Sequence, residues 1–209
     1  MYSMSELAHK FLEPVLHHQA ICIDATLGYG RDSRFFLEGN ARRVFAYEIQ
    51  EELYEDTTRM LQSLNPDYES RLHTFLKDHS LMDQDLDLYQ GRIDAVIFNF
   101  GYDPHTLCGI CTRPQTSVRA VSIGADLLKA RGRMALVFYP HPAGKEEKKA
   151  VMEMLKARSD LELLEIRHPF KDNAPSLTCV EKKRSARSKK NSTGTINDNE
   201  RKQSSDSCS

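Results

Sequence analysis

The sequence has 209 residues, of which 40% are hydrophobic, so it can bury the core of one ordinary domain, and wholesale disorder is excluded. Its net charge of −1 divides unequally: residues 182–209 hold eight basic and three acidic residues, which leaves −6 on residues 1–181. No segment has the roughly 20 apolar residues of a membrane helix, and residues 1–16 do not resemble a signal peptide. Five cysteines, an odd number, argue against a disulfide framework, so we expect a reduced, cytoplasmic protein.

Apolar runs alternate with amphipathic segments along the chain. The pattern predicts helices over residues 3–18, 34–37, 51–64, 115–130 and 145–157, and strands over residues 20–23, 44–47, 72–76, 93–98, 134–138, 161–166 and 177–180. Strands separated by helices indicate βαβ units. Only a loop joins the last two strands, so these should pair antiparallel. We therefore predict an α/β fold: a doubly wound, mostly parallel, seven-stranded Rossmann-like sheet with an antiparallel C-terminal hairpin and helices on both faces.

The last part of the sequence differs in composition from the rest. Residues 182–209 contain one strongly apolar residue, Ile196, among Lys, Arg, Ser, Asn, Gln and Thr. Such a segment buries too little apolar surface to offset its ordering entropy, so we predict a folded domain at 1–181 and a disordered basic tail at 182–209. The +5 charge of the tail favours a salt-sensitive contact with nucleic-acid phosphates. A merely solubilising role is the alternative.

A glycine-containing turn follows the first predicted strand. Gly28 and Gly30 allow a sharp turn and a close approach of a ligand to the backbone, at the strand end where open α/β sheets bind ligands. Twenty positions after Gly28, at the end of the second strand, Glu48 can accept hydrogen bonds from both hydroxyls of a ribose. Asp78, after the third strand, can accept one from the amine of an adenine.

The residues around this turn discriminate between cofactors. A dinucleotide fingerprint needs a third glycine, but Ser33 stands at that position, and no Walker lysine motif occurs. Asp24 and Asp32 flank the turn and would repel a pyrophosphate. They suit a cationic cofactor without phosphates, which is S-adenosylmethionine. The alternatives are a nicotinamide or nucleotide-sugar enzyme on the same sheet, and a turn with a purely structural role.

A second group of candidate residues follows the fourth and fifth strands. Residues 99–102, Asn-Phe-Gly-Tyr, are similar to the N/D-P-P-Y motif of methyltransferases that act on exocyclic amines. Asn99 would orient an amine, Tyr102 would stack on a base, and Tyr139 or His141 would take the proton. The pair Cys108 and Cys111 lacks the second pair of ligands of a structural zinc site, so we predict no metal.

Together these residues resemble a family of small class I methyltransferases often described as rRNA methylases. Its characterised members methylate the aminomethyl group of a wobble 2-thiouridine in tRNA. Residues 24–33 match the pattern D-A-T-x-G-x-G-x-D-[ST], and residues 48–50 match an acidic residue followed by Ile-Gln. Residues 78–80, 99–102, 112–116 and 139–144 resemble further elements of the family. The main departures, in residues 103–108 and at Pro140 and Pro142, lie at the inferred substrate cleft.

The resemblance implies a class I methyltransferase sheet and a set of functional residues. Cofactor binding falls to Asp24, Thr26, Gly28, Gly30, Asp32, Glu48, Gln50, Asp78 and His79, and catalysis to Asn99, Tyr102, Tyr139 and His141. We therefore predict an S-adenosylmethionine-dependent N-methyltransferase of tRNA. An rRNA or small-amine substrate, and a catalytically degenerate RNA-binding member, stay open as alternatives.

RNA binding requires positive charge, which the −6 body must supply locally. We expect it from Arg31, Arg34, Arg113 and Arg119 around the cleft, together with the tail. No membrane partner is expected. The sequence leaves the oligomeric state open between a monomer and a homodimer.

Overall fold

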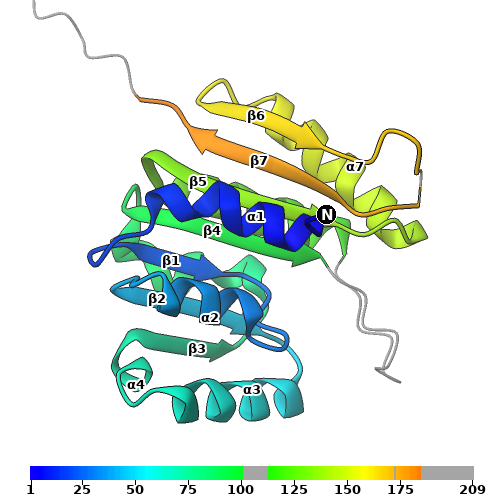
Figure 1. Cartoon of the computed structure of the whole chain (residues 1–209). Helices are drawn as coiled ribbons and strands as arrows, with labels where there is room; N and C mark the ends of the chain where they lie inside the picture. Colours follow the sequence, from blue (N-terminus) through cyan, green and yellow to red (C-terminus); the bar gives the residue numbers. More distant parts are fainter. Residues whose placement is uncertain (101–112, 172, 185–209) are drawn as a thin grey trace, which may run out of the picture.

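The computed structural model describes residues 1–100, 113–171 and 173–184. In this part of the chain one sheet of seven strands has the order β3-β2-β1-β4-β5-β7-β6 (Figure 1). The strands are β1 (Ile21–Asp24), β2 (Arg43–Glu48), β3 (Leu72–Leu76), β4 (Ile93–Phe100), β5 (Leu128–Phe138), β6 (Leu161–Ile166) and β7 (Ser176–Lys182). The first five pair in parallel, and β7 lies antiparallel between β5 and β6. The predicted fold class is confirmed.

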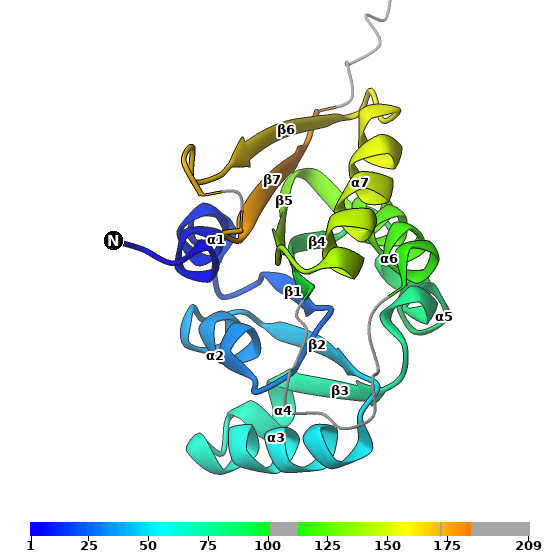
Figure 2. The ribbon, with the colours of Figure 1, turned by 90° about the vertical axis from the view of Figure 1, so that its right-hand side faces the viewer.

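Helices cover both faces of this sheet. They are α1 (Met4–Leu12), α2 (Arg31–Glu38), α3 (Glu51–Leu64), α4 (Tyr68–Arg71), α5 (Asp83–Leu86), α6 (Pro114–Leu127) and α7 (Pro142–Lys156). Figure 2 shows α1 and α2 on one side of the sheet and α5, α6 and α7 on the other. Short 3-10 helices follow α1 at Glu13–Val15, β3 at His79–Leu81 and α5 at Asp87–Tyr89. The connections that follow β1, β2 and β3 leave the carboxyl edge of the sheet, where ligands bind in such folds.

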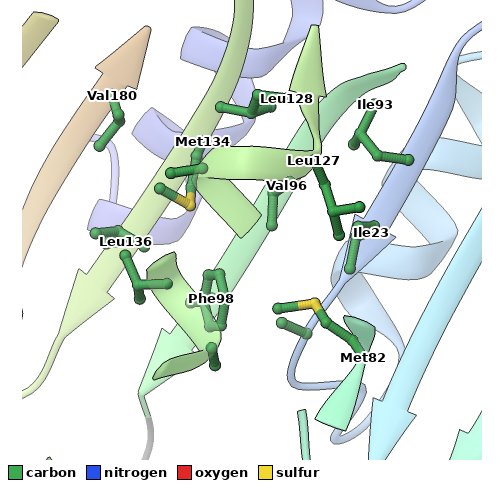
Figure 3. Packing of buried hydrophobic residues seen from close by; sticks show 14 of the residues in the cluster. Ile23, Met82, Ile93, Val96, Phe98, Leu127, Leu128, Met134, Leu136 and Val180 are labelled. Atoms are coloured by element: carbon green, nitrogen blue, oxygen red, sulfur yellow. The ribbon is translucent and has the colours of Figure 1, made fainter. Parts of the chain in front are cut away.

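The side chains of each central strand alternate between two apolar layers. In β4, Val96 and Phe98 belong to the apolar layer that includes residues of α6 and α7, and Figure 3 shows them beside Leu127 and Met134. Ala95 and Ile97 belong to the layer under α1 and α2. Because the period of a strand is two residues, Asn99 continues the second series and faces the α1 side. Tyr139, just beyond β5, packs against that same layer. The sheet therefore directs both residues to one face.

Several boundaries differ from prediction. The predicted helix 115–130 ends at Leu127, and residues 128–130 belong to β5 instead. Leu128 is buried, as the helical spacing required, but its burial comes from pairing with Ile93 of β4. The register then shifts where Arg131 has a φ of 69°. The end of β4 also differs from prediction, because Asn99 lies within this strand and not after it.

Two lysines that the prediction assigned to the tail have contacts with the folded body. Lys182 ends β7, and its ammonium group bonds to Asp160 at 2.8 Å and to the carbonyl of Ala125 at 2.9 Å. The backbone N–H of Lys183 donates to the carbonyl of Asp160 at 2.9 Å. Both lysines are thus part of the folded body. The remainder of the predicted tail holds six basic and three acidic residues, and residues 185–209 lie outside the described part of the chain.

The first turn of α7 approaches the end of β5 so closely that only glycine fits. A Cβ atom on Gly144 would lie 2.3 Å from the carbonyl oxygen of Tyr139. We expect Gly144→Ala to destabilise the fold by about 2–3 kcal/mol and to lower the Tm by roughly 5–10 °C. Gly124→Ala in α6 is the matched control, because the tightest contact of its Cβ would be the flexible Met134 sulfur at 3.3 Å and the helix would gain about 1 kcal/mol of propensity. Equal thermal denaturation curves for the two variants would contradict this account of Gly144.

Candidate functional site

The turn between β1 and α2 is organised by a buried carboxylate. Asp24 ends β1 with no exposed surface, and it accepts hydrogen bonds from the Ser33 hydroxyl at 2.7 Å and from the Thr26 N–H at 3.1 Å. The Thr26 hydroxyl in turn accepts from the backbone N–H of Asn99 at 2.8 Å. These bonds fix the turn after β1 directly against the end of β4. Ser33, the residue that excluded a dinucleotide motif, therefore supports Asp24.

The two glycines of the turn have different roles. Gly28 has a φ of 48°, and a Cβ there would meet nothing closer than 3.7 Å, so its surroundings are open to a ligand. Gly30 has a φ of 73°, but a Cβ there would collide with Thr57 and Leu61 of α3 at 2.8–2.9 Å. The absence of a side chain at Gly30 thus allows α3 to pack closely against the turn. Both of their N–H groups already donate within the protein, to Glu48 and to the carbonyl of Leu27.

Two carboxyl groups share the interior of this turn without a lysine or arginine among the described residues. Asp32, in the first turn of α2 and 5% exposed, lies 2.6 Å from Nε2 of His9 and accepts from the side-chain nitrogen of Asn99 at 2.7 Å. Burial, and then the charge of Asp32, raise the pKa of Asp24 to about 7. A pKa near neutrality means that this pair would gain from a bound cation.

Glu48 closes the other side of the turn. One carboxylate oxygen accepts from the N–H of Gly28 at 3.0 Å, and the other accepts from the N–H groups of Ile49 and Gln50 at 2.9 and 3.0 Å. A carboxylate offers about four acceptor positions, so these three bonds hold it in place and leave further capacity. Gln50 contributes its backbone here, and it precedes α3 without a side-chain cap.

Asp78 and His79 follow β3 and border the same edge of the sheet. Asp78 caps a 3-10 helix by accepting from the Ser80 N–H at 2.7 Å. His79 is buried, and its Nδ1 donates to the carbonyl of Ala25 at 3.0 Å. Burial lowers the pKa of His79, so the ring is neutral and its Nε2 is an acceptor. Among the described residues Nε2 has no hydrogen-bond partner.

Asn99 joins the cofactor residues to the predicted catalytic residues. Its nitrogen faces Asp32, which as a carboxylate can only accept, and so its oxygen faces the opposite way. There the hydroxyls of Tyr139 and Ser5 lie 3.4 Å from that oxygen. The structure thus brings Asn99, Tyr139 and Asp32 together, with an amide oxygen at the end of β4 as their meeting point.

His141 has a structural task that its sequence position did not reveal. Its Nδ1 accepts from the N–H of Gly144 at 3.0 Å and so caps α7. A neutral ring with an accepting Nδ1 carries its proton on Nε2, which argues against proton acceptance at that nitrogen. Tyr102, Cys108 and Cys111 lie outside the described residues, so their predicted roles stay predictions.

The chain is similar to a family of known sequences and to several solved structures. A family model described as "Putative rRNA methylase" matches residues 44–181. The chain belongs to this family. Two solved relatives agree: a "putative rRNA-methylase" from Clostridium thermocellum is 30% identical with a TM-score of 0.79, covering 87% of this chain and 98% of that one. A "putative methyltransferase" from Streptococcus mutans, solved in complex with SAH, is 30% identical with a TM-score of 0.76, covering 87% of this chain and 99% of that one.

A curated relative comes from a plant. The chloroplastic tRNA (mnm(5)s(2)U34)-methyltransferase of Arabidopsis thaliana is 31% identical over 156 residues, which are 70% of this chain. The match spans 57% of the length of the plant protein. The predicted family is thereby confirmed, and the chain is a methyltransferase of the rRNA methylase family. Within its described residues no helix is long and apolar enough to cross a membrane, and no group of metal-ligating side chains occurs.

The N-terminal helix contributes to the site of this rRNA methylase family member, which sequence reasoning missed. Ser5 and His9 lie one helical turn apart on α1 and reach Asn99 and Asp32 respectively. His9 is also stacked on Phe35 of α2, with ring centroids 4.0 Å apart. The spacing of Ser5 and His9 was the available signal, but nothing in the sequence placed α1 beside β4.

A third missed residue is Glu147 of α7. Its side chain is 1% exposed and accepts a hydrogen bond from the hydroxyl of Ser117 in α6. A buried glutamate inside a charged helical segment is not distinguishable by pattern from its exposed neighbours. It fixes α6 against α7 behind the strand ends.

The chemistry of the donor set fits S-adenosylmethionine. Asp24 and Asp32 are two buried carboxyl groups whose basic partner among the described residues is the imidazole of His9. A ligand ammonium group would compensate their negative charge. Glu48 keeps acceptor capacity for hydroxyl groups, and Gly28 leaves open space beside it. A phosphate would instead face three carboxylates.

Proposed function

We propose that this chain transfers a methyl group from S-adenosylmethionine to an amine of RNA, and that the amine is the aminomethyl group of wobble 5-aminomethyl-2-thiouridine in tRNA. The observation that carries the proposal is the Asn99 oxygen, which the Asp32 contact turns toward Tyr139 at the end of β4. Family membership makes the chain an S-adenosylmethionine-dependent methyltransferase. The name of the Arabidopsis relative supports the tRNA substrate.

We propose that the acidic turn holds the cofactor. Asp24 and Asp32 take its α-ammonium group, Glu48 takes the ribose hydroxyls, and Asp78 takes the adenine amine. Thr26, Gly28, Gly30, Gln50 and His79 shape this cradle through the contacts described above. When bound, S-adenosylmethionine supplies an activated methyl group on its sulfonium.

The residues at the end of β4 would then act on the amine. An alkylamine has a pKa near that of lysine, about 10.4, and must be neutral to attack, which a half-buried site favours. Asn99 Oδ1 and the carbonyl of Phe100 accept its hydrogens, and Tyr102 stacks on the base. The Tyr139 hydroxyl donates a hydrogen bond to the Asn99 oxygen, and its own oxygen can accept a hydrogen from the amine. Catalysis in this scheme is mostly alignment, and His141 supports it by capping α7.

Nucleoside mass spectrometry of tRNA tests the substrate. We expect cells that lack the gene to accumulate the unmethylated aminomethyl-thiouridine, and re-expression of the chain to restore the methylated form. Purified chain and S-adenosylmethionine should also convert the tRNA of those cells in vitro. Because the family description names rRNA, the rRNA nucleosides of the same cells are measured in parallel. An unchanged tRNA profile together with a methyl group missing from rRNA would show that the substrate is rRNA and not tRNA.

A further inference from the structure

A basic pocket adjoins the proposed methyl-transfer site. It has a volume of about 180 Å³ and lies between the first turns of α7, the end of β5 and the loop that joins β6 to β7. Its charged walls come from Lys145, Lys148, Glu165, Arg167, His168 and Lys171. Tyr139, whose hydroxyl bonds to Asn99, lines the same pocket. A group held here would therefore be next to the nucleotide that reacts.

The charge of this pocket is not neutralised within the described residues. Lys148 is already occupied, because its ammonium group bonds to Glu165 at 2.7 Å and to the Ser176 hydroxyl at 2.8 Å. That pair uses the one acidic residue among the pocket walls. Lys145, Arg167 and Lys171 form no ion pair with any residue that the structure describes. Three cations without a carboxylate partner favour an anionic ligand.

An exposed aromatic ring stands in the same loop. Phe170 is 96% exposed, with Arg167 and His168 before it and Lys171 after it. A single exposed apolar residue needs no explanation by itself. An aromatic side chain among unpaired cations, beside an anion pocket, is the combination that binds single-stranded nucleic acid by stacking and by phosphate contacts.

Two of the arginines expected from sequence to bind RNA are instead engaged with acidic residues. Arg34 donates to Glu38 at 2.7 Å, and Arg119 donates to Asp83 at 2.8 Å and to the carbonyl of Ser80 at 2.6 Å. Their charges are compensated, whereas those of the pocket are not. The pocket is the stronger candidate for a phosphate contact.

We propose that this pocket binds a backbone phosphate of the RNA strand beside the target nucleotide, and that Phe170 stacks on a neighbouring base. The proposal rests on the RNA substrate of the proposed function and adds the surface that recognises it. Lys145, Arg167 and Lys171 supply the phosphate contacts. Because the pocket shares Tyr139 with the reaction site, its occupation places the strand against the end of β5.

The charge contribution is tested by the double variant Arg167→Ala/Lys171→Ala. We expect the affinity for an anticodon stem-loop RNA to fall about tenfold, and the slope of log K against log salt to become shallower by about 0.7, the contribution of one neutralised phosphate on a single strand. Lys149→Ala/Lys156→Ala is the matched control: it removes the same charge from exposed positions of α7 outside the pocket. The affinity for S-adenosylhomocysteine should stay unchanged in both variants.

The stacking contribution is tested separately at Phe170. We expect Phe170→Ala to lower RNA affinity about tenfold with an unchanged salt slope, and Phe170→Tyr to bind within about twofold of the original protein. Inorganic phosphate, added as a competitor at constant ionic strength, distinguishes a site for any phosphate from a site for the strand. Only a strand site requires Phe170.

The outcomes separate this proposal from the proposed function. If the unaltered protein methylates RNA while the pocket variants bind RNA like the Lys149→Ala/Lys156→Ala control, the pocket proposal is wrong and the proposed function stands. If the unaltered protein neither binds nor methylates RNA, both are wrong. Weaker RNA binding with a shallower salt slope and intact cofactor binding supports the pocket.

Discussion

The affinity for S-adenosylhomocysteine should fall about tenfold between pH 8 and pH 6. Burial and the neighbouring Asp32 raise the pKa of Asp24 to about 7, so at pH 6 most of the cofactor-free protein carries a protonated Asp24. A cationic ammonium group favours the ionised carboxyl, and its binding must displace that proton. The affinity therefore rises with pH through neutrality and levels off above it. Isothermal titration calorimetry across this range, in buffers of different ionisation enthalpy, measures both the affinity and the proton released.

Asp24→Asn should remove this pH dependence and weaken binding about 30-fold at pH 8, the cost of one partner of a buried charged pair. The variant is nearly isosteric and retains a group for the Ser33 hydroxyl. Histidine side chains also change charge in this range, so His9→Gln, at the residue beside Asp32, is the control. Methylthioadenosine, which lacks the amino-acid part, should bind independently of pH. A pH-dependent affinity for methylthioadenosine would contradict the proposed role of Asp24.

Asn99→Ala should lower the single-turnover rate of RNA methylation by about 100-fold while the affinity for S-adenosylhomocysteine changes by less than about threefold. The amide oxygen is the group we assign to the orientation of the amine, and misplacement of a reacting atom by about 1 Å costs on this order. Asp32 retains its contact with His9 when Asn99 is lost, so the cofactor side of the site should persist. Rapid-quench measurement with tRNA from cells that lack the gene gives the rate of the chemical step.

Tyr139→Phe is the matched comparison for Asn99→Ala. It removes the hydroxyl that donates to the Asn99 oxygen but leaves the amide in place, so we expect a loss of about tenfold. An Asn99→Ala rate equal to that of the unaltered protein, with cofactor binding intact, would exclude the orienting role. A larger loss in Tyr139→Phe than in Asn99→Ala would place the main contact on the phenol.

Local pattern was sufficient for most of the architecture. The α3 helix and the β3 and β6 strands have the predicted boundaries, because each is delimited by a change of hydrophobic period or by a proline. The acidic turn and Glu48 were also recognisable, since their positions depend on strand ends that the apolar runs mark. The start of β5 could not be recognised from the sequence, because its first residues carry helix-forming side chains. Pairing with β4 holds them as a strand.

The substrate side depended more on tertiary contacts than on pattern. That α1 places Ser5 and His9 at the site follows from its packing beside β4 and β5, and no local signal reports such packing. Likewise, whether an arginine is available for RNA depends on its neighbours in space. Arg119 pairs with Asp83, which is 36 positions away in sequence, and Arg167 has no such partner among the described residues.

The position of β7 has a consequence for the order in which the molecule is assembled during synthesis. The strand that separates β5 from β6 follows both of them along the chain. Among the described strands, β6 therefore has no hydrogen-bonding neighbour until residues 176–182 have emerged from the ribosome. The half of the sheet with the acidic turn is complete much earlier (Figure 1). In a nascent chain the residues of the acidic turn are therefore made well before the strand that ties the loop of the basic pocket to the sheet.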